Sequence, residues 1–562
     1  MKKRVKNQLL GSKLWQTIVV GGNIRKSLIT AMLAITAILA TSNLANAVNV
    51  KDYGAQGIGG DDTAAIQAAI AAATASGGDH VVYFPPGTYG TATITITAPL
   101  ELTGNGTILK IANTSGHLIY STNSLRITGN MTLDANKANT PDPGNGTSAC
   151  TIYHVGADLY INKATLMPSY SINIRSCATI SVTLIDCNVT GGYMCVLANV
   201  GTNCKVDIRG GVYSNAAVDD NIQVHNSNQF TISGVTSSGA ARSGIVVVNN
   251  AARGSIANCT CFDNKIDTYN QGGWGIVCSV ATNNIDITGN HCYNNERGPL
   301  SIDTQGYSER FDAHVAVTGN VFDAEYNGGY GSNGIYINGS RRVTVTGNRI
   351  RKARLSILIV YSEFNNITGN TIEDCGDGYF VSCVNSKNVK ISNNIFSSST
   401  SSAYNLFQFY SSQNIDINDN KITGVAGQRS LFRFTDATNF NVFGNTAVKD
   451  DAGTGYVVYL TGGNSNGLIK NNLFRSSFNA FQWYICNSGT ITDVITEHNE
   501  IKVPSLSHAR YIYTGTSIVA DGDTINGIKD SYSTAPTGWS FKTGQLAVIG
   551  GAIKYYNGSS WQ

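Results

Sequence analysis

Four acidic residues in two short segments have the types and spacing that cleavage of a glycosidic bond requires. Asp219 and Asp220 stand together in AVDDNIQVHNS, and Glu296 and Asp303 lie in NNERGPLSIDTQ. Cleavage needs one protonated carboxyl to donate to the leaving oxygen and one ionised carboxylate to activate water or attack the sugar. Burial of neighbouring carboxyls can separate their pKa values in this way. We therefore expect catalytic carboxylates here; the alternative is that these acids only form turns or a solvated surface.

Five further residues near these segments are candidates for holding a saccharide. His225 is a candidate acid/base or sugar ligand, and Arg242 and Arg297 could neutralise a sugar carboxylate. The rings of Trp274 and Tyr336 could stack on sugar faces, with ordinary packing as the alternative. The sequence has no CxxC pair and no His/Cys cluster, so we expect neither a metal nor a cofactor.

A short repeat determines which elements carry these residues. Alternating apolar residues, a turn pair such as Gly-Asn and another apolar residue recur every 22 to 31 residues from Ala164 onward. Short strands with sharp Asn/Gly turns at this period are typical of a β-solenoid, whereas propeller blades need ~40–50 residues. Asparagines stacked on successive coils can hydrogen-bond to one another. The clearest copies end at Asn130, Asn290, Asn320, Asn348, Asn370, Asn394, Asn420, Asn445, Asn472 and Asn499.

A second strand precedes each repeat marker, and its copies align in two inward stripes. The first stripe is Ile222, Ile245, Ile276, Leu300, Ile335 and Ile357. The second stripe is Val224, Val247, Cys278, Ile302, Ile337 and Ile359. Side chains alternate along a strand, so the residues between these stripes face outward, where chemistry can occur.

The spacing of the coils limits which carboxylates can act together. Coils lie ~4.8 Å apart, so Asp219 and Asp303, three coils apart, are separated by roughly 14 Å along the axis. A glycosidase pair needs ~5–9.5 Å. The pair is therefore Asp219 with Asp220, or Glu296 with Asp303. The longest intervals, of 31, 30 and 28 residues, run from Cys259 to Asn348 and predict loops that wall a groove beside these acids.

The start of the exported chain carries a family signature. VNVKDYGAQGIGGDDTAAIQAAIAAA (48–73) predicts a helix that covers the open end of the solenoid, and GGDHVVYFPPGTY (77–89) predicts a strand and turn. This arrangement resembles the pectate-lyase-like superfamily, which includes phage tailspikes and polysaccharide lyases. The resemblance implies an all-β, right-handed parallel β-helix of about 14–16 coils. Hydrolases, lyases, epimerases and adhesins share that fold, so the resemblance leaves the reaction open.

The Asp219-Asp220 segment also resembles the paired-Asp motif of polygalacturonase-type hydrolases. The match has two departures: the preceding coil has SINIRSC where those enzymes carry another Asp, and the following coil has Arg242-Ser243 in place of their His. The resemblance therefore implies catalytic carboxylates without supplying the whole set.

Four regions are expected along the chain. Residues 1–47 form a signal segment, in which Arg25-Lys26, a short apolar run and Ala45-Asn46-Ala47 predict export with cleavage. Residues 48–100 form the N-terminal cap and first strands, and residues 101–505 the β-helix. Residues 506–562 form a small β module, similar to the ends of trimeric tailspikes, which predicts a homotrimer or, alternatively, a monomeric cap.

Charge and cysteine content narrow the function. Seven of the 39 basic residues lie in the signal segment, which has no acidic residue, so residues 48–562 carry 32 basic against 36 acidic residues. A net charge of −4 without a basic patch argues against nucleic-acid binding. Several of the 12 cysteines fall within aligned strands or at turns, which predicts buried free thiols, although bridges such as Cys195–Cys204 remain an alternative.

Together these features predict a secreted, periplasmic or surface protein that binds an exopolysaccharide and is not membrane-bound after signal cleavage. Our first hypothesis is a tailspike-like glycoside hydrolase that cleaves biofilm or capsule glycan within the chain. The alternatives are a lyase or epimerase on a uronic-acid polymer, which needs a cationic neutraliser and a base, and a glycan-binding adhesin without catalysis.

Overall fold

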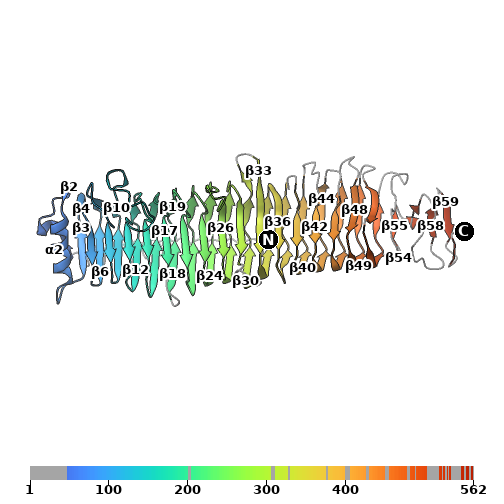
Figure 1. Cartoon of the computed structure of the whole chain (residues 1–562), viewed down its shortest axis with the longest axis horizontal. Helices are drawn as coiled ribbons and strands as arrows, with labels where there is room; N and C mark the ends of the chain where they lie inside the picture. The colour runs from blue at the N-terminus through green and yellow to red at the C-terminus, as the bar shows by residue number, and fades with distance from the viewer. Residues whose placement is uncertain are drawn as a thin grey trace, which may run out of the picture.

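The protein is a long rod of stacked β-coils, as the computed structural model shows (Figure 1). Each coil supplies one strand to each of three parallel sheets, here called sheets A, B and C. The coils number about 16, which confirms the predicted parallel β-helix. Residues 47–562 are described except for the following positions: 200–203, 305–310, 327–328, 375–377, 399–405, 426–429, 450–454, 477–480, 488, 503–517, 522, 526–527, 530, 533–545, 550–551, 556–558 and 561. The predicted signal segment lies outside the described residues, apart from Ala47.

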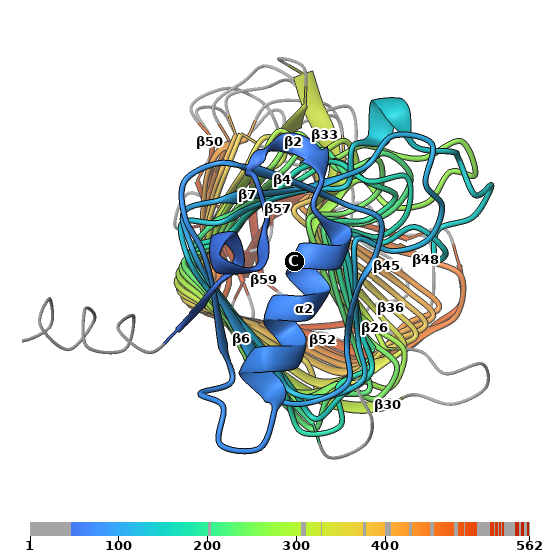
Figure 2. The ribbon, with the colours of Figure 1, turned by 90° about the vertical axis from the view of Figure 1, so that its left-hand side faces the viewer.

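The helix α2 (Thr63–Thr74) lies across the N-terminal end of the rod, as the end view shows (Figure 2). Ile66, Ala69, Ile70 and Ala73 are buried on the side that meets the first coils, which confirms the predicted covering helix. Asp62 precedes the helix, but its carboxylate accepts from the backbone amides of Gln56 and Gly57 and does not cap the helix. Among the described residues, no helix combines the length and apolar character needed to cross a bilayer.

Sheet C carries the predicted stripes and the candidate acids. Its register pairs Ile222 with Ile245 and Ile245 with Ile276, and every member of both inward stripes is fully buried. The strands of sheet C are β5 (Ile94–Ile96), β8 (Ile119–Ser121), β11 (Ile152–His154), β14 (Ile174–Ser176), β17 (Val196–Asn199), β20 (Ile222–His225), β23 (Ile245–Val248), β26 (Trp274–Ser279), β29 (Gly298–Asp303), β33 (Gly329–Asn338), β36 (Ala353–Val360), β39 (Val381–Val384), β42 (Phe407–Tyr410), β45 (Phe432–Thr435), β48 (Gly455–Thr461) and β51 (Phe481–Asn487).

Sheets A and B complete each coil around the site. The chain passes from sheet B through sheet C to sheet A, and then returns to sheet B. Around the candidate acids, sheet A contributes β18 (Lys205–Arg209), β21 (Gln229–Ser233), β24 (Ala252–Ala257) and β27 (Asn283–Thr288). Sheet B contributes β16 (Asn188–Thr190), β19 (Val212–Ser214), β22 (Thr236–Ser238), β25 (Thr260–Phe262) and β28 (His291–Tyr293).

A ladder of buried asparagines joins the coils at the turn between sheets A and B. Asn290 Nδ2 donates to Asn320 Oδ1 at 3.0 Å, and Asn320 Nδ2 also donates to the carbonyl of Ile287 at 2.9 Å. The residue before each ladder position turns left-handed, as at Gly319 with φ 63°, which explains the Gly-Asn pair of the repeat. The ladder extends to Asn499, which donates to Asp523 Oδ1 at 3.0 Å.

The ten cysteines whose side chains are described form no disulfide with one another, and nine of them are buried. The predicted use of cysteine as a small apolar residue is therefore confirmed there, and the bridge Cys195–Cys204 is absent. Within the predicted C-terminal module, the described residues include a three-stranded sheet of β57 (Ser531–Tyr532), β58 (Leu546–Ile549) and β59 (Ala552–Tyr555).

Candidate active site

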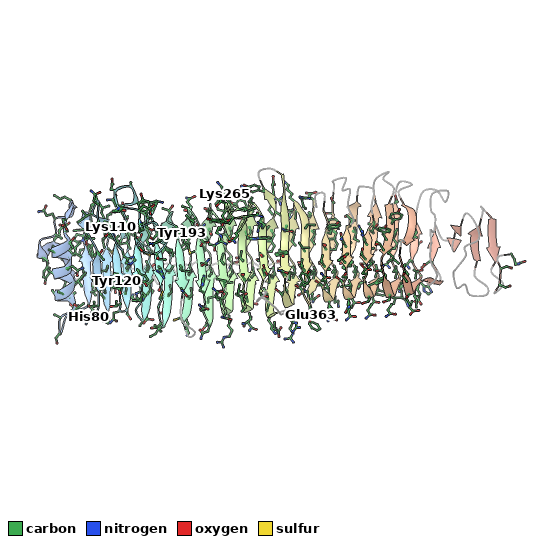
Figure 3. All side chains as sticks on the ribbon, in the orientation of Figure 1. His80, Lys110, Tyr120, Tyr193, Lys265 and Glu363 are labelled. Carbon is green, nitrogen blue, oxygen red and sulfur yellow. The ribbon has the colours of Figure 1, made fainter. Side chains whose placement is uncertain are left out.

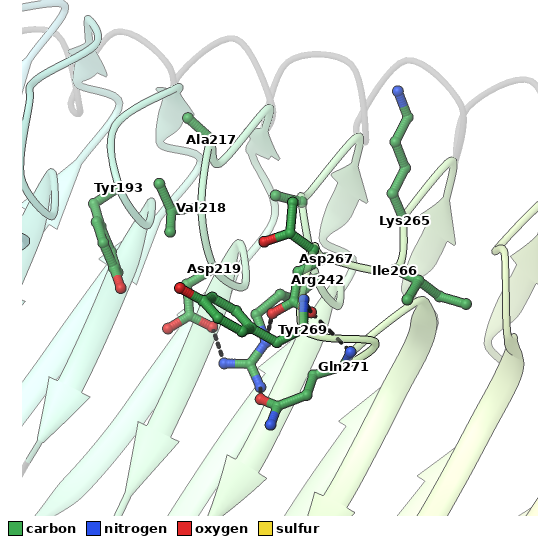
Figure 4. Close-up of a pocket in the computed structure, with 12 residues that line it drawn as sticks. Tyr193, Ala217, Val218, Asp219, Arg242, Lys265, Ile266, Asp267, Tyr269 and Gln271 are labelled. Carbon is green, nitrogen blue, oxygen red and sulfur yellow. Dashed lines mark hydrogen bonds and ion pairs between the residues drawn. The ribbon is translucent and has the colours of Figure 1, made fainter.

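A cleft of about 580 Å³ lies where the chain enters sheet C on successive coils (Figure 4). Segments just before β17, β20 and β23 form its floor, and the loop 263–271 between β25 and β26 forms one wall. This loop belongs to the 31-residue interval, so that part of the predicted groove wall is confirmed. The lining residues are Tyr193, Ala217, Val218, Asp219, Ala241, Arg242, Lys265, Ile266, Asp267, Thr268, Tyr269 and Gln271.

Arg242 is the central charged group of the cleft. Its Nη1 lies 2.8 Å from Asp219 Oδ1, and its Nε lies 3.4 Å from Asp267 Oδ2. Its Nη2 also donates to the side-chain oxygen of Gln271. Asp267 Oδ1 in turn accepts from the backbone amide of Gln271 at 2.8 Å, which closes the loop over the arginine. These contacts fix the Asp219 carboxyl group against the guanidinium in a partly buried position.

Asp220, the next residue, is only 4% exposed and lies behind the residues that line the cleft. Its Oδ1 accepts from the backbone amide of Ser243 at 2.8 Å, and its Oδ2 accepts from Gln223 Nε2 at 2.8 Å. Burial, assisted by the charge of Asp219, raises the pKa of Asp220 to about 7. A carboxyl with a near-neutral pKa is suited to donate a proton in acid/base cleavage.

A chain of hydrogen bonds connects Asp220 to the outer face of β20. Asn249 Nδ2 lies 3.0 Å from His225 Nδ1, and because an amide nitrogen only donates, Nδ1 must accept. His225 Nε2 therefore carries the proton and donates to Gln223 Oε1, and Gln223 donates onward to Asp220. Burial lowers the pKa of His225, so the imidazole is neutral near pH 7.

Glu296 and Arg297 hold the loop 263–271 from the next coil. Glu296 Oε2 accepts from the backbone amide of Ile266 at 2.8 Å. Arg297 Nη2 donates to the carbonyl of Asn270 at 2.8 Å and to its side-chain oxygen at 2.9 Å. Both residues therefore contact the loop that forms the wall of the cleft, but they do not line the cleft themselves.

The structure does not bring Glu296 and Asp303 together as a pair. Glu296 precedes β29 and Asp303 ends it, where Asp303 accepts from Asn338 Nδ2 at 3.0 Å. At ~3.3 Å per residue the two are roughly 20 Å apart along the strand, beyond the ~5–9.5 Å of a glycosidase pair. Asp219 with Asp220 is the pair that remains.

The expected aromatic platform is a packed pair. Trp274 is 6% exposed and stacks on Tyr336, with ring centroids 6.1 Å apart and planes 13° apart. Burial, together with Asp303, raises the pKa of Tyr336. Trp274 is thus covered, and the aromatic residues of the cleft are Tyr193 and Tyr269.

Several lining residues carry no signal in the sequence. Tyr193, Asp267 and Gln271 belong to no repeat motif. The 31-residue interval indicated the loop that brings Asp267 and Gln271 to Asp219, whereas nothing in the sequence indicated Tyr193. Among the described residues, no group of three or more His, Cys, Asp or Glu side chains could hold a metal ion.

Comparison with known proteins identifies two family models. Residues 47–298 match the model described as "Rhamnogalacturonase A/epimerase, pectate lyase-like", which contains the whole cleft. Residues 312–483 match that of "Periplasmic copper-binding protein (NosD)". The described residues of that stretch do not provide a donor set for copper, since Cys383 is fully buried in the core.

One curated relative is an Azotobacter vinelandii protein named mannuronan C5-epimerase AlgE6. It is 40% identical over 120 residues, which cover 17% of this chain and 13% of that protein. The present chain therefore matches only a small part of its relative's length.

Solved structures with similar coils share little sequence with this chain. An N-terminal fragment of bacteriophage phi29 gene product 12 is 15% identical, with a TM-score of 0.45 over 88% of this chain and 96% of that one. The tailspike protein 3 of bacteriophage CBA120 is 12% identical, with a TM-score of 0.32 over 93% and 69%. The coil architecture and the family model of residues 47–298 confirm the predicted pectate-lyase-like right-handed β-helix.

Proposed function

We propose that this pectate-lyase-like β-helix is an exported enzyme that hydrolyses glycosidic bonds in a bacterial exopolysaccharide at the Asp219–Asp220 cleft. The observation that carries the proposal is the different environment of two adjacent carboxyls: Asp220 is buried, which raises its pKa to about 7, while Asp219 lines the cleft and is paired with Arg242. Adjacent Cα atoms are ~3.8 Å apart, so the two carboxyl carbons lie within roughly 9 Å, inside the range of glycosidase pairs.

In this proposal each carboxyl has one role. Asp220 gives its proton to the glycosidic oxygen as the bond to the anomeric carbon breaks. Asp219 accepts a proton from the water that attacks that carbon, or attacks the carbon itself before water releases the sugar. Arg242 holds the Asp219 side chain in position, and the chain through Gln223 and His225 holds that of Asp220.

A uronate epimerase or lyase is the second candidate, favoured by the segment shared with a mannuronan C5-epimerase. Such an enzyme removes the proton next to the sugar carboxylate, which a cation must neutralise. Arg242 could neutralise that carboxylate, and His225, kept neutral by its burial, is the candidate base. Tyr307 is a further candidate base and Arg310 a further candidate neutraliser, and both lie outside the described residues.

One incubation separates these functions. The exported protein is mixed with acidic exopolysaccharides, and reducing ends, absorbance of unsaturated uronate and uronate composition are followed. Hydrolysis predicts new reducing ends without unsaturated product. Unsaturated product would establish a lyase, changed composition at constant length an epimerase, and binding without any change an adhesin. The location of the protein outside the cytoplasm remains a prediction, which cell fractionation checks. The homotrimer also remains a prediction, which light scattering checks.

A further inference from the structure

Three basic side chains gather where the chain passes from sheet B to sheet C, several coils before the cleft. Lys110 ends β7 (Thr107–Lys110), His117 precedes β8, and Arg175 lies in β14. Burial, together with the charges of Lys110 and Arg175, lowers the pKa of His117 to about 4, and His117 and Arg175 both lie against the ring of Tyr153. Among the ion pairs of the described residues, none includes Lys110 or Arg175.

Neither buried Lys110 nor partly buried Arg175 has an anionic partner among the described residues. Lys110 is 2% exposed, and its Nζ contacts only the carbonyls of Ser115, at 3.1 Å, and Gly116. Arg175 lies over the ring of Tyr153, 4.9 Å from its centroid, and its buried Nε has no hydrogen-bond partner. A buried donor without an acceptor is unfavourable, so an anionic ligand would find two positive groups prepared for it.

Aromatic rings flank these cations on the same face. Tyr120, Tyr153 and Arg175 occupy equivalent outward positions of β8, β11 and β14, one coil apart. The His117 and Tyr153 rings have centroids 4.8 Å apart, and those of Tyr120 and Tyr153 are 5.8 Å apart. Partly exposed rings beside a guanidinium provide the apolar surface and the charge that an acidic sugar unit needs.

Residues in register on successive coils connect these cations to the cleft. In register, Arg175 is followed by Leu197 and then by Gln223, the partner of Asp220. A small apolar cluster separate from the main core packs against Tyr153, Leu197 and Tyr193, and Tyr193 lines the cleft. Lys110, Tyr193 and Lys265 follow one another along one side of the rod (Figure 3). Arg175 and Gln223 are two coils, or roughly 10 Å, apart.

We propose that Lys110, His117 and Arg175 form an anion-binding subsite that holds the carboxylate of a uronic acid unit of the polymer while a neighbouring stretch occupies the cleft. This inference rests on the proposed function, which gives a polysaccharide as the ligand. It adds that the polysaccharide carries carboxylate groups. The Arg175 guanidinium can bind a carboxylate through two parallel hydrogen bonds, and Tyr153 supports the sugar ring.

The test compares binding of charged and uncharged forms of the same sugars. Hexasaccharides of mannuronate, guluronate, galacturonate and glucuronate, and their carboxyl-reduced counterparts, are titrated calorimetrically into the exported protein. We expect at least one uronate oligomer to bind about tenfold more tightly than its reduced form, because charge-assisted hydrogen bonds are lost on reduction. Arg175→Gln should remove that preference and leave the affinity for the reduced sugar unchanged.

Two further variants keep the result interpretable. Lys110→Met should weaken the same preference, and Arg253→Gln, an exposed arginine of β24 in sheet A, should leave it unchanged. Equal affinity for charged and reduced sugars, or an unchanged preference in both Arg175→Gln and Lys110→Met, would overturn the subsite. Selective binding of uronate oligomers without cleavage would contradict the proposed hydrolysis but not the subsite. Cleavage that is unchanged in Arg175→Gln would contradict the subsite but not the hydrolysis.

Discussion

Arg242 reaches back by one coil to Asp219, placing its Nη1 2.8 Å from Oδ1 of the carboxylate. The contact exists because the two residues occupy equivalent positions before β20 and β23. It keeps a negative charge next to Asp220, and this charge adds to burial in raising the pKa of Asp220. The charge of Arg242 opposes this effect on Asp220, so burial remains the main cause of the raised pKa of Asp220.

The pH dependence of hydrolysis should follow Asp220. Because its pKa is raised to about 7, the protonated form predominates below pH 7 and is lost above it. The value of kcat/KM should therefore fall roughly tenfold for each pH unit well above 7. Initial rates measured from pH 5 to 9 check this, and a rate that stays constant up to pH 9 would exclude Asp220 as the proton donor.

Glu296 should act through the loop 263–271 and not as a catalyst. Glu296→Gln keeps an oxygen that can accept from the Ile266 amide, so kcat should stay close to that of the unaltered protein. Glu296→Ala removes the acceptor and should raise KM several-fold. Steady-state kinetics of the two variants distinguish the roles, because a catalytic carboxylate would lose kcat about 100-fold in both.

Asp523→Asn should stabilise the protein at neutral pH. Burial raises the pKa of Asp523 to about 6, although hydrogen bonds from Thr496 and Asn499 oppose the shift. A carboxyl whose pKa is raised in the folded state destabilises the protein when it is ionised. This penalty is absent below pH ~4 and develops as the pH rises to about 6 and above. Asparagine would continue the ladder without charge, and the gain should be about 2 kcal/mol at pH 7.5.

Thermal unfolding at two pH values measures this effect. The Tm of Asp523→Asn should exceed that of the unaltered protein at pH 7.5 and equal it near pH 4. Asp286→Asn, at an exposed position of β27, serves as the control and should change neither value. A lower Tm at pH 7.5 for Asp523→Asn would show that a charged carboxylate at the end of the ladder stabilises the protein more than an amide does.

The cysteines should contribute to stability as buried thiols. Burial raises the pKa of Cys278 to about 12, and the ten described cysteines form no disulfide. The Tm should therefore be the same with and without a reducing agent, and native protein should react slowly with a thiol reagent. A Tm that drops on reduction would reveal a bridge that stabilises the coils.

The sequence predicts best what the repeat itself determines. Ile222 and Val224 are buried as expected because alternation along a strand leaves no choice once the coils are in register. Asp219 and Asp220 stand out because two acids precede such a strand. Contacts made by loops have no period, so the pairing of Arg242 with Asp267 and the use of Glu296 as a loop anchor are visible only in three dimensions.

Trp274 shows why the burial of a single residue can differ from what the alternation of its strand predicts. Its alignment placed it at the border of the outward face, yet it is buried because Gly298 occupies the equivalent position of the next coil. A Cβ on Gly298 would lie 3.1 Å from Cζ3 of Trp274 and 2.2 Å from the carbonyl oxygen of Asn333. The glycine leaves the space that the indole uses to stack on Tyr336.

The most direct measurement is the release of reducing ends from acidic exopolysaccharide by Asp220→Asn, compared with Asp207→Asn. Asp207 is a partly exposed carboxylate of β18 in sheet A, paired with Arg209, and serves as the matched control. Loss of the proton donor should lower kcat by about 100-fold or more in Asp220→Asn, with substrate binding retained and full activity in Asp207→Asn. Undiminished release by a folded Asp220→Asn variant would contradict the assignment of this cleft as the hydrolytic site.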